Sequence, residues 1–298
     1  MAAPDSIRVR CPAKINLGLW ILGRREDGYH EVDTILQTVA LEDELTLEPV
    51  PQGFSVETQG IPIPHNGPNL VERAWNLISE RATGSKFRGI RARLTKRIPI
   101  GAGLGGGSSD AAGFLAGVNH LLELGLTKTE LHSLGARLGS DVPFFFEGGT
   151  ARATGRGEKV RQLCPIEPFW VVLASPPTAI STTWAYGRIR FHLTPERSGA
   201  NLLASAIGSR EWGAVADAMH NVFEDVVLPD FPSLAELKRS LIGLGAMKAL
   251  MSGSGSTLYG VARSFDEAMR AAKGIAGRGA EVRVVRTLER GVHVARRA

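Results

Sequence analysis

The sequence predicts an α+β protein of two domains, and three observations support this fold class. The chain has 298 residues, which is roughly the length of two ordinary domains. In the first half, a strand pattern, a glycine-rich segment and a helical pattern follow one another within residues 90–122. In the second half, the patterns follow in the order helix, strand, strand, helix, strand. We place the domain boundary after residue 165, which gives domains 1–165 and 166–298.

The glycine-rich segment, residues 99–109, is the most informative stretch of the chain. It holds five glycines from Gly101 to Gly107, and glycine is unfavourable inside a packed strand or helix. Such a run can adopt positive φ angles and bring bare backbone close to a ligand. A helical pattern follows, with Ser108 or Ser109 as its expected N-cap. Strand, glycine loop and helix start together direct free N–H groups and the helix dipole at an anion.

Two familiar phosphate-binding loops do not fit this segment. The Walker loop ends in Gly-Lys-Ser/Thr, whereas Ser108 and Ser109 follow Gly107 without a lysine. A dinucleotide-binding loop needs an acidic residue about twenty residues later, at the end of a second strand. Glu130 has that spacing, but it lies in a helix-start signal. A flexible linker is the remaining alternative, although linkers rarely lead into a well-patterned amphipathic helix.

The N-terminal strands present a second group of candidate residues. Residues 7–11 alternate, and a second strand follows Pro12 with apolar side chains at the odd positions 15–21. Lys14 and Asn16 therefore share the opposite face of that strand. A lysine beside an asparagine on one face is most often exposed to solvent, so a binding role is the less common outcome.

Further candidates follow turns. Turn residues 23–28 end the second strand, and Tyr29 and His30 come directly after them, either as surface residues or as binding residues of a loop. Asp141 follows the glycine that ends a predicted helix, and its apolar neighbours indicate a partly dry environment. The alternative for Asp141 is that it only shapes the turn before Pro143.

Capping residues and alternation indicate the remaining elements. Short strands are expected within residues 41–57. The expected helix starts are Asn69, the capping boxes Thr127–Glu130 and Ser233–Glu236, and Ser264. The expected strands of the second half are 169–174, 249–251, 258–261 and 281–287, with a glycine–serine loop at 252–257. This order is typical of an α/β sandwich of ferredoxin-like type.

Composition and charge exclude several classes of protein. Hydrophobic content of 43% with 22% charged residues is that of an ordinary globular protein. No apolar run is long enough to span a membrane, and no signal-peptide pattern opens the chain. Two cysteines without CxxC spacing favour a reducing cytoplasm over a disulfide or zinc framework. The net charge of +5 comes from scattered basic residues, so we expect a solvated surface and no nucleic-acid partner.

Four segments taken together resemble a known enzyme superfamily. They are residues 12–16 with the Gly-Tyr-His at 28–30, the loop at 99–109, Leu-Gly-Ser-Asp-Val-Pro at 138–143, and Ser-Gly-Ser-Gly-Ser at 252–256. In this order they resemble the galactokinase, homoserine, mevalonate and phosphomevalonate kinases, and they cover most of the chain. The first segment is most similar to the kinases of the methylerythritol phosphate route to isoprenoids. The resemblance implies an N-terminal domain of ribosomal-S5-like fold and a ferredoxin-like C-terminal domain.

The resemblance also implies an activity and a set of site residues. The implied reaction is ATP-dependent phosphorylation of a tertiary alcohol in a small substrate that carries a cytidine diphosphate group. The implied catalytic pair is Lys14 and Asp141, and the implied substrate contacts are Asn16, Tyr29, His30 and Tyr186. The implied ATP-binding residues are Pro99, Ile100, Gly101, Ala102, Gly103, Leu104, Gly105, Gly106, Gly107, Ser108 and Ser109.

The sequence leaves the metal site and two segments without an assigned role. Mg²⁺ is expected with ATP, and because no acidic pair marks a metal site, Ser108 or Ser109 is the best available ligand. The Pro-Pro at 176–177, where family members often have Pro-Gly, and the segment Asn221-Val-Phe-Glu224 both depart from the usual pattern. A sister kinase acting on mevalonate or homoserine, a non-catalytic nucleotide-binding regulator and a basic nucleic-acid binder are the alternative functions. The oligomeric state is not predicted.

Overall fold

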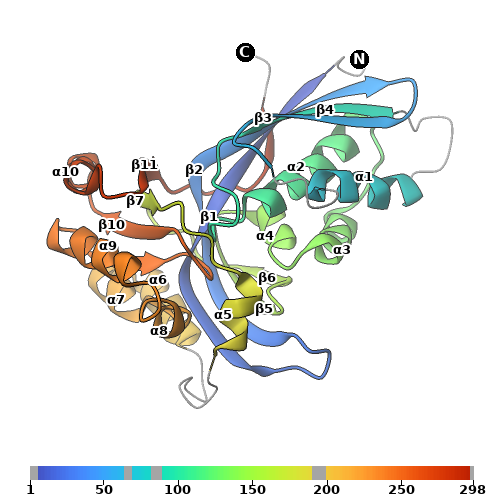
Figure 1. Ribbon diagram of the computed structural model, residues 1–298. Helices are drawn as coiled ribbons and strands as arrows, with labels where there is room; N and C mark the ends of the chain where they lie inside the picture. The colour runs from blue at the N-terminus through green and yellow to red at the C-terminus, as the bar shows by residue number, and fades with distance from the viewer. Residues whose placement is uncertain (1–5, 64–68, 82–88, 190–198, 296–298) are drawn as a thin grey trace.

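The computed structural model describes residues 6–63, 69–81, 89–189 and 199–295, and it contains two β-sheets (Figure 1). The first sheet has eight strands in the order β12-β1-β2-β4-β3, with β5 on β2, β6 on β5 and β8 on β1. Its strands are β1 (Ile7–Arg24), β2 (His30–Val50), β3 (Phe54–Gly60), β4 (Gly89–Lys96), β5 (Thr150–Gly155), β6 (Lys159–Gln162), β8 (His220–Asn221) and β12 (His293–Ala295).

One continuous strand, β1, replaces the two strands expected on either side of Pro12. A β-bulge between Pro12 and Ala13 lets the strand continue past a residue that has no N–H to donate. The bulge also changes which face the odd positions occupy. Val9 packs in the core under the N-terminal helices, whereas Ile15 packs in the core between the two sheets. Both faces of β1 are therefore covered, and Lys14 is buried rather than exposed.

Helices α1 (Leu70–Arg81), α2 (Gly106–Leu121), α3 (Lys128–Leu138) and α4 (Val142–Glu147) pack together on one side of the long β1–β2 hairpin (Figure 1). The expected caps at Asn69 and Thr127 are confirmed, each by a reciprocal pair of hydrogen bonds. The expected cap at Ser108 or Ser109 is wrong. Helix α2 begins inside the glycine run: Gly105, with φ 70°, is its N-cap, and Ser108 and Ser109 already lie within the helix.

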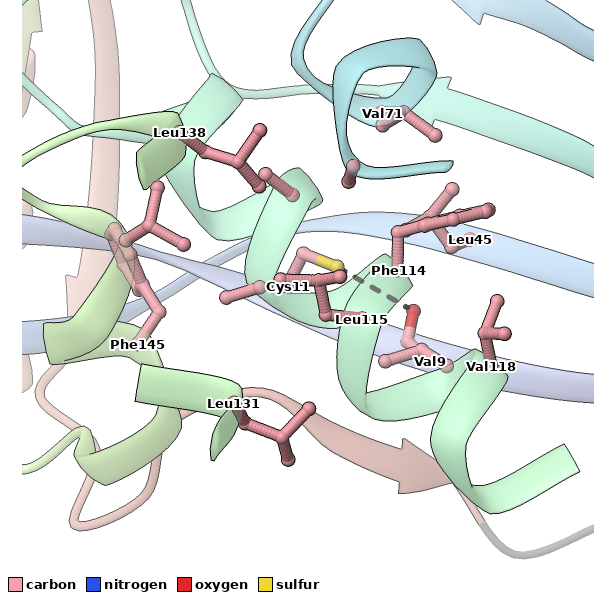
Figure 2. Close-up of a cluster of buried hydrophobic side chains, with 14 of the residues drawn as sticks. Val9, Cys11, Leu45, Val71, Phe114, Leu115, Val118, Leu131, Leu138 and Phe145 are labelled. Carbon is pink, nitrogen blue, oxygen red and sulfur yellow. Dashed lines mark hydrogen bonds between the residues drawn. The ribbon is translucent and has the colours of Figure 1, made fainter. Parts of the chain in front are cut away.

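Helix α2 packs directly against β1, which places the glycine loop over that strand. Figure 2 shows its residues Phe114, Leu115 and Val118 packed around Cys11 and Val9 of β1. Two glycines of α2 permit this close approach. A Cβ atom on Gly113 would lie 2.4 Å from the sulfur of Cys11, and one on Gly117 would lie 2.5 Å from Leu47.

The second sheet has the order β11-β7-β10-β9 with every pair antiparallel, as a ferredoxin-like sandwich requires. The expected cap at Ser264 is confirmed, but the capping box at Ser233 is wrong, because the helix begins at Pro232, a favoured first residue. The elements are β7 (Trp170–Ser175), α5 (Thr182–Gly187), α6 (Ala200–Ser209), α7 (Trp212–Ala218), α8 (Glu224–Val227), α9 (Pro232–Gly243), β9 (Lys248–Met251), β10 (Leu258–Ala262), α10 (Phe265–Ile275) and β11 (Glu281–Arg286).

The two halves of the chain are joined by more than the connection near residue 165. Strands β8 and β12 belong to the second half by sequence, yet both pair with β1 in the first sheet. A split into domains 1–165 and 166–298 stays a prediction. None of the helices in the described ranges has the length and apolar character needed to cross a membrane.

Candidate active site

Two cavities meet at the glycine loop. The larger, of about 830 Å³, lies between the β1–β2 hairpin, α4, α5 and the loop after β9, and the smaller, of about 430 Å³, lies between the glycine loop and the start of α1. Gly101, Gly103, Gly105 and Ser108 line both. The larger cavity brings together all six residues predicted outside the loop: Lys14, Asn16, Tyr29, His30, Asp141 and Tyr186.

Lys14 and Asp141 form a pair in the lining of the larger cavity. The Lys14 ammonium lies 3.6 Å from Asp141 Oδ2 and donates to Asn16 Oδ1 at 2.7 Å. The Lys14 side chain is 5% exposed, whereas that of Asp141 is 37% exposed and faces the cavity. Asp141 precedes α4, but its carboxylate makes no capping hydrogen bond to the described first turn. The carboxylate is therefore available to a ligand.

Asn16 fixes the orientation of the lysine. Its amide nitrogen donates to Thr34 Oγ1 at 2.9 Å, and the Thr34 hydroxyl donates to the carbonyl of Gly18 at 2.6 Å. The Tyr259 hydroxyl donates to the backbone oxygen of Asn16 at 2.7 Å. With the amide nitrogen engaged in this way, the amide oxygen of Asn16 is left to accept from Lys14.

Backbone contacts hold the glycine loop in place, so it is not a flexible linker. The N–H of Lys14 donates to Leu104 O at 2.9 Å, and the Ser252 hydroxyl donates to Gly103 O at 2.8 Å. Gly101, Gly103 and Gly105 adopt φ of 66°, 78° and 70°. Residues with a Cβ rarely adopt such angles, so the backbone favours glycine at all three positions.

The loop residues divide according to what they face. Pro99, Ile100, Ala102, Gly106 and Gly107 line the smaller cavity in addition to the four residues that line both. Leu104 and Ser109 belong to neither lining, because the Leu104 side chain packs in the core between the sheets and the Ser109 hydroxyl is buried without a described partner. Of the two serines considered for Mg²⁺, only Ser108 faces the cavities.

A buried ionic cluster, which the sequence analysis missed, forms one wall of the smaller cavity. The Lys96 ammonium donates to Asp110 Oδ2 at 2.7 Å and to Asp43, which also accepts from the N–H of Ile98. The pKa of Asp110 is raised to about 8, and the largest cause is burial of its carboxyl group. The positive charge of Lys96 lowers this pKa, whereas the negative charge of Asp43 raises it. The sequence contains a signal for this cluster, because Lys96 falls on the even positions of β4, which are buried.

Aromatic residues line the outer end of the larger cavity. The rings of His30 and Tyr186 lie 4.8 Å apart, and the Tyr186 ring meets Phe223 edge-on at 4.9 Å. The guanidinium of Arg156 lies 4.8 Å above the ring of Tyr29, which is 54% exposed. Burial, and then the charge of Arg24, lowers the pKa of His30, which favours a neutral imidazole at pH 7.

Two of these neighbours were not predicted from the sequence. Arg156 lies in the turn between Gly155 and Gly157, both with positive φ. A single basic residue between two glycines is the sequence feature by which it could have been found. Phe223 lies in the segment whose role was left open, and no pattern in the sequence points to its contact with Tyr186.

The arrangement suits the transfer of a group between two ligands. Bare backbone at Gly101 and Gly103 separates the two cavities, and an ammonium and a carboxylate stand on one side of it. Such a pair can accept a proton from a hydroxyl and neutralise negative charge on a transferred group. The described residues contain no cluster of three or more His, Cys, Asp or Glu side chains that could hold a metal ion by themselves.

Comparison with known proteins agrees with this geometry. The family models described as GHMP kinases N terminal domain and GHMP kinases C terminal match residues 69–149 and 203–280. A crystal structure of 4-(cytidine 5'-diphospho)-2C-methyl-D-erythritol kinase superposes with a TM-score of 0.81 at 36% identity, over 94% of this chain and 99% of that one. Homoserine kinase from Cytophaga hutchinsonii, at 18% identity and a TM-score of 0.77, shares the fold.

Curated relatives show to which group of kinases within this family the chain is similar. The 4-diphosphocytidyl-2-C-methyl-D-erythritol kinase of Pelotomaculum thermopropionicum is 41% identical over 261 residues, 87% of this chain and 90% of the relative. That of Syntrophotalea carbinolica is 42% identical over 268 residues, 90% of this chain and 93% of the relative. The expected fold class is confirmed, and the protein is an ATP-dependent kinase. The chain belongs to the 4-diphosphocytidyl-2-C-methyl-D-erythritol kinases of the GHMP kinase family.

Proposed function

We propose that this kinase transfers the γ-phosphoryl group of ATP to the 2-hydroxyl of 4-diphosphocytidyl-2-C-methyl-D-erythritol, in the methylerythritol phosphate route to isoprenoid precursors. The observation that supports this most directly is the Lys14–Asp141 pair beside the backbone that separates the two cavities. We infer the identity of the acceptor from the names of the relatives. We place the protein in the cytoplasm, with no nucleic-acid partner.

ATP occupies the smaller cavity in this proposal. Its nucleoside lies between the loop and the start of α1, and its phosphates lie on the loop, where the N-terminus of the 16-residue helix α2 points toward them. The hydroxyl oxygen of Ser108, which lines both cavities, fits Mg²⁺, a hard cation that binds through few protein ligands together with substrate phosphates. When bound, that ion would neutralise phosphate charge.

The acceptor hydroxyl lies against Asp141 on the other side of the loop. Phosphoryl transfer depends mainly on positioning and on neutralising charge. Asp141 Oδ2 accepts the hydroxyl proton as the acceptor oxygen bonds to the γ-phosphorus, while the bond from that phosphorus to the bridging oxygen breaks and ADP leaves; the Lys14 ammonium offsets charge on the transferred group. Asn16 holds that ammonium by its 2.7 Å hydrogen bond, so the lysine needs little rearrangement when the substrates arrive.

The cytosine of the acceptor binds among Tyr29, His30 and Tyr186. The edge-on contact with Phe223 fixes the Tyr186 ring, so that ring offers a rigid face for stacking. The imidazole of His30, which is neutral at pH 7, can offer one ring nitrogen to the base edge. In this arrangement stacking supplies affinity, and hydrogen bonds distinguish one base from another.

This base pocket predicts discrimination between pyrimidines. Cytosine and uracil reverse donor and acceptor at two ring positions, so each buried group left unpaired costs about 1–3 kcal/mol. We expect the uridine analogue to lose at least about tenfold in kcat/KM. Tyr186→Ala should weaken both analogues alike, since any base stacks on a ring, while Tyr186→Phe keeps the ring and serves as the matched control.

A single assay tests the function and the pocket together. ADP release is measured with ATP, Mg²⁺ and a panel containing the cytidine acceptor, its uridine analogue, mevalonate and homoserine. The proposal expects turnover with the cytidine compound well above the others. Equal kcat/KM for the cytidine and uridine compounds would contradict the base pocket, and preference for mevalonate or homoserine would identify a sister kinase.

A further inference from the structure

The side chains of Asn221 and Glu224 lie between the two sheets and have no part in the mechanism above, although Phe223 between them contacts Tyr186. Asn221 belongs to β8, a two-residue strand that pairs in parallel with Gly18 and Leu19 of β1. The N–H of Val222 donates to Leu19 O at 3.1 Å. The backbone of this segment is therefore fixed to the strand that also carries Lys14.

The Asn221 side chain reaches across to the second sheet. It is fully buried, and its amide nitrogen donates to Met251 O at 2.7 Å and to Gly253 O at 2.8 Å. Its amide oxygen accepts from the N–H of Phe223 at 3.0 Å. Both amide hydrogens and the oxygen are therefore engaged, so a single orientation of this side chain satisfies the site.

Glu224 holds the same backbone from the other side. Its Oε1 accepts from the N–H of Met251 at 2.8 Å, and its Oε2 pairs with the ammonium of Lys238 on α9 at 2.5 Å. Glu224 is 9% exposed. Asn221 and Glu224 thus hold both the carbonyl and the N–H of Met251, the last residue before the 252–256 loop.

The 252–256 loop contacts each part of the candidate active site. The Ser252 hydroxyl donates to Gly103 O in the glycine loop at 2.8 Å. Gly253 lies beside Lys14, so that a Cβ on Gly253 would be 3.4 Å from the ammonium. Ser254 shares a hydrogen bond of 3.2 Å with Thr182 of α5, the helix that carries Tyr186.

We propose that Asn221 and Glu224 are positioning residues for phosphoryl transfer. They fix the 252–256 loop, and through that loop they set the glycine loop, Lys14 and α5 relative to one another. The reaction they serve rests on the proposed function, but the contacts do not depend on which alcohol is the acceptor. A misplacement of about 1 Å can lower turnover about 10²-fold without removing any substrate contact.

Asn221→Asp tests this most directly, because the variant keeps the shape of the side chain but replaces two donors by an oxygen that faces two carbonyls. We expect kcat to fall about 10²-fold, with KM for each substrate changed less than about threefold. Hydrogen exchange should become faster at the amides of the 252–256 loop. The control is Asp225→Asn, an exposed acid-to-amide change on α8, for which we expect parental kinetics.

Glu224 supplies a second, independent pair of variants. Glu224→Gln keeps an oxygen for the N–H of Met251 and should retain most of the turnover, whereas Glu224→Ala should lose it and accelerate loop exchange. This pair decides the matter if Asn221→Asp does not fold. A lower Tm with unchanged kcat per folded molecule would overturn the proposal. Absence of turnover by the parent with the cytidine acceptor would instead contradict the proposed function, and loop exchange would still test the positioning.

Discussion

Asp141→Asn is expected to lower kcat by about 10²–10⁴-fold, the usual effect of losing a general base. The amide has nearly the same shape as the carboxylate but cannot accept the proton of the acceptor hydroxyl. Asp141 makes no capping bond to the described start of α4, so the fold loses little. Steady-state kinetics of ADP release, together with a titration of ATP binding, should show lost turnover with retained nucleotide affinity.

Two further variants make this result specific. Asp266→Asn is the same chemical change at an exposed acid of α10, and it should leave kcat unchanged. Lys14→Met keeps the aliphatic stem that packs near Gly105 and removes the ammonium, so turnover should fall in the same direction as for Asp141→Asn. Near-normal turnover in both active-site variants would mean that the roles are wrongly assigned even though the family is known.

Much of the fold was predictable because its signals are local. Asn69, Thr127 and Ser264 begin their helices as expected, since a capping residue acts on the N–H groups of the next turn. The alternation from Ile90 to Leu94 is strand β4. The helix starts that failed were decided by backbone conformation: Gly105 begins α2 about one turn before the serines would, and Pro232 takes the first helical position from Ser233.

The burial of the site was not predictable from periodicity. Alternation places Lys14 and Asn16 on one face of a strand, but it does not reveal that a glycine loop and a second sheet cover both faces. The bulge after Pro12 adds to this, because one extra residue exchanges the two faces. For Lys96, in contrast, periodicity alone predicts burial. It falls on the buried even positions of β4, and only its charge argues for exposure.

The glycines of the loop could not be told apart in the sequence, although the structure gives them different reasons to be glycine. A Cβ on Gly103 would lie 1.9 Å from the carbonyl oxygen of Ser252, and one on Gly105 would lie 2.9 Å from the ring of Phe145. The protein itself requires glycine at those two positions. A Cβ on Gly101 would have no described atom within 4 Å. A substitution there would therefore affect only the backbone conformation and the space for a ligand.

Gly101→Val is therefore expected to weaken nucleotide binding strongly without disturbing the packing of the loop. The branched side chain would project into open space that both cavities share, where the proposal places the phosphates of ATP. We expect ATP affinity to fall at least about 10²-fold, as several backbone contacts to phosphate are lost at about 1 kcal/mol or more each. Titration with a non-hydrolysable ATP analogue measures this directly.

Gly125→Val separates ligand exclusion from backbone strain. Gly125 lies in the turn after α2 with φ 69°, against 66° for Gly101, and a Cβ there would likewise have no described atom within 4 Å. The two valines should therefore cost similar stability, about 1–3 kcal/mol for a non-glycine residue in this region. Because Gly125 lines neither described cavity, its variant should bind ATP normally. Equal loss of ATP affinity in both variants would assign the effect to strain, and normal affinity in Gly101→Val would remove the phosphates from this loop.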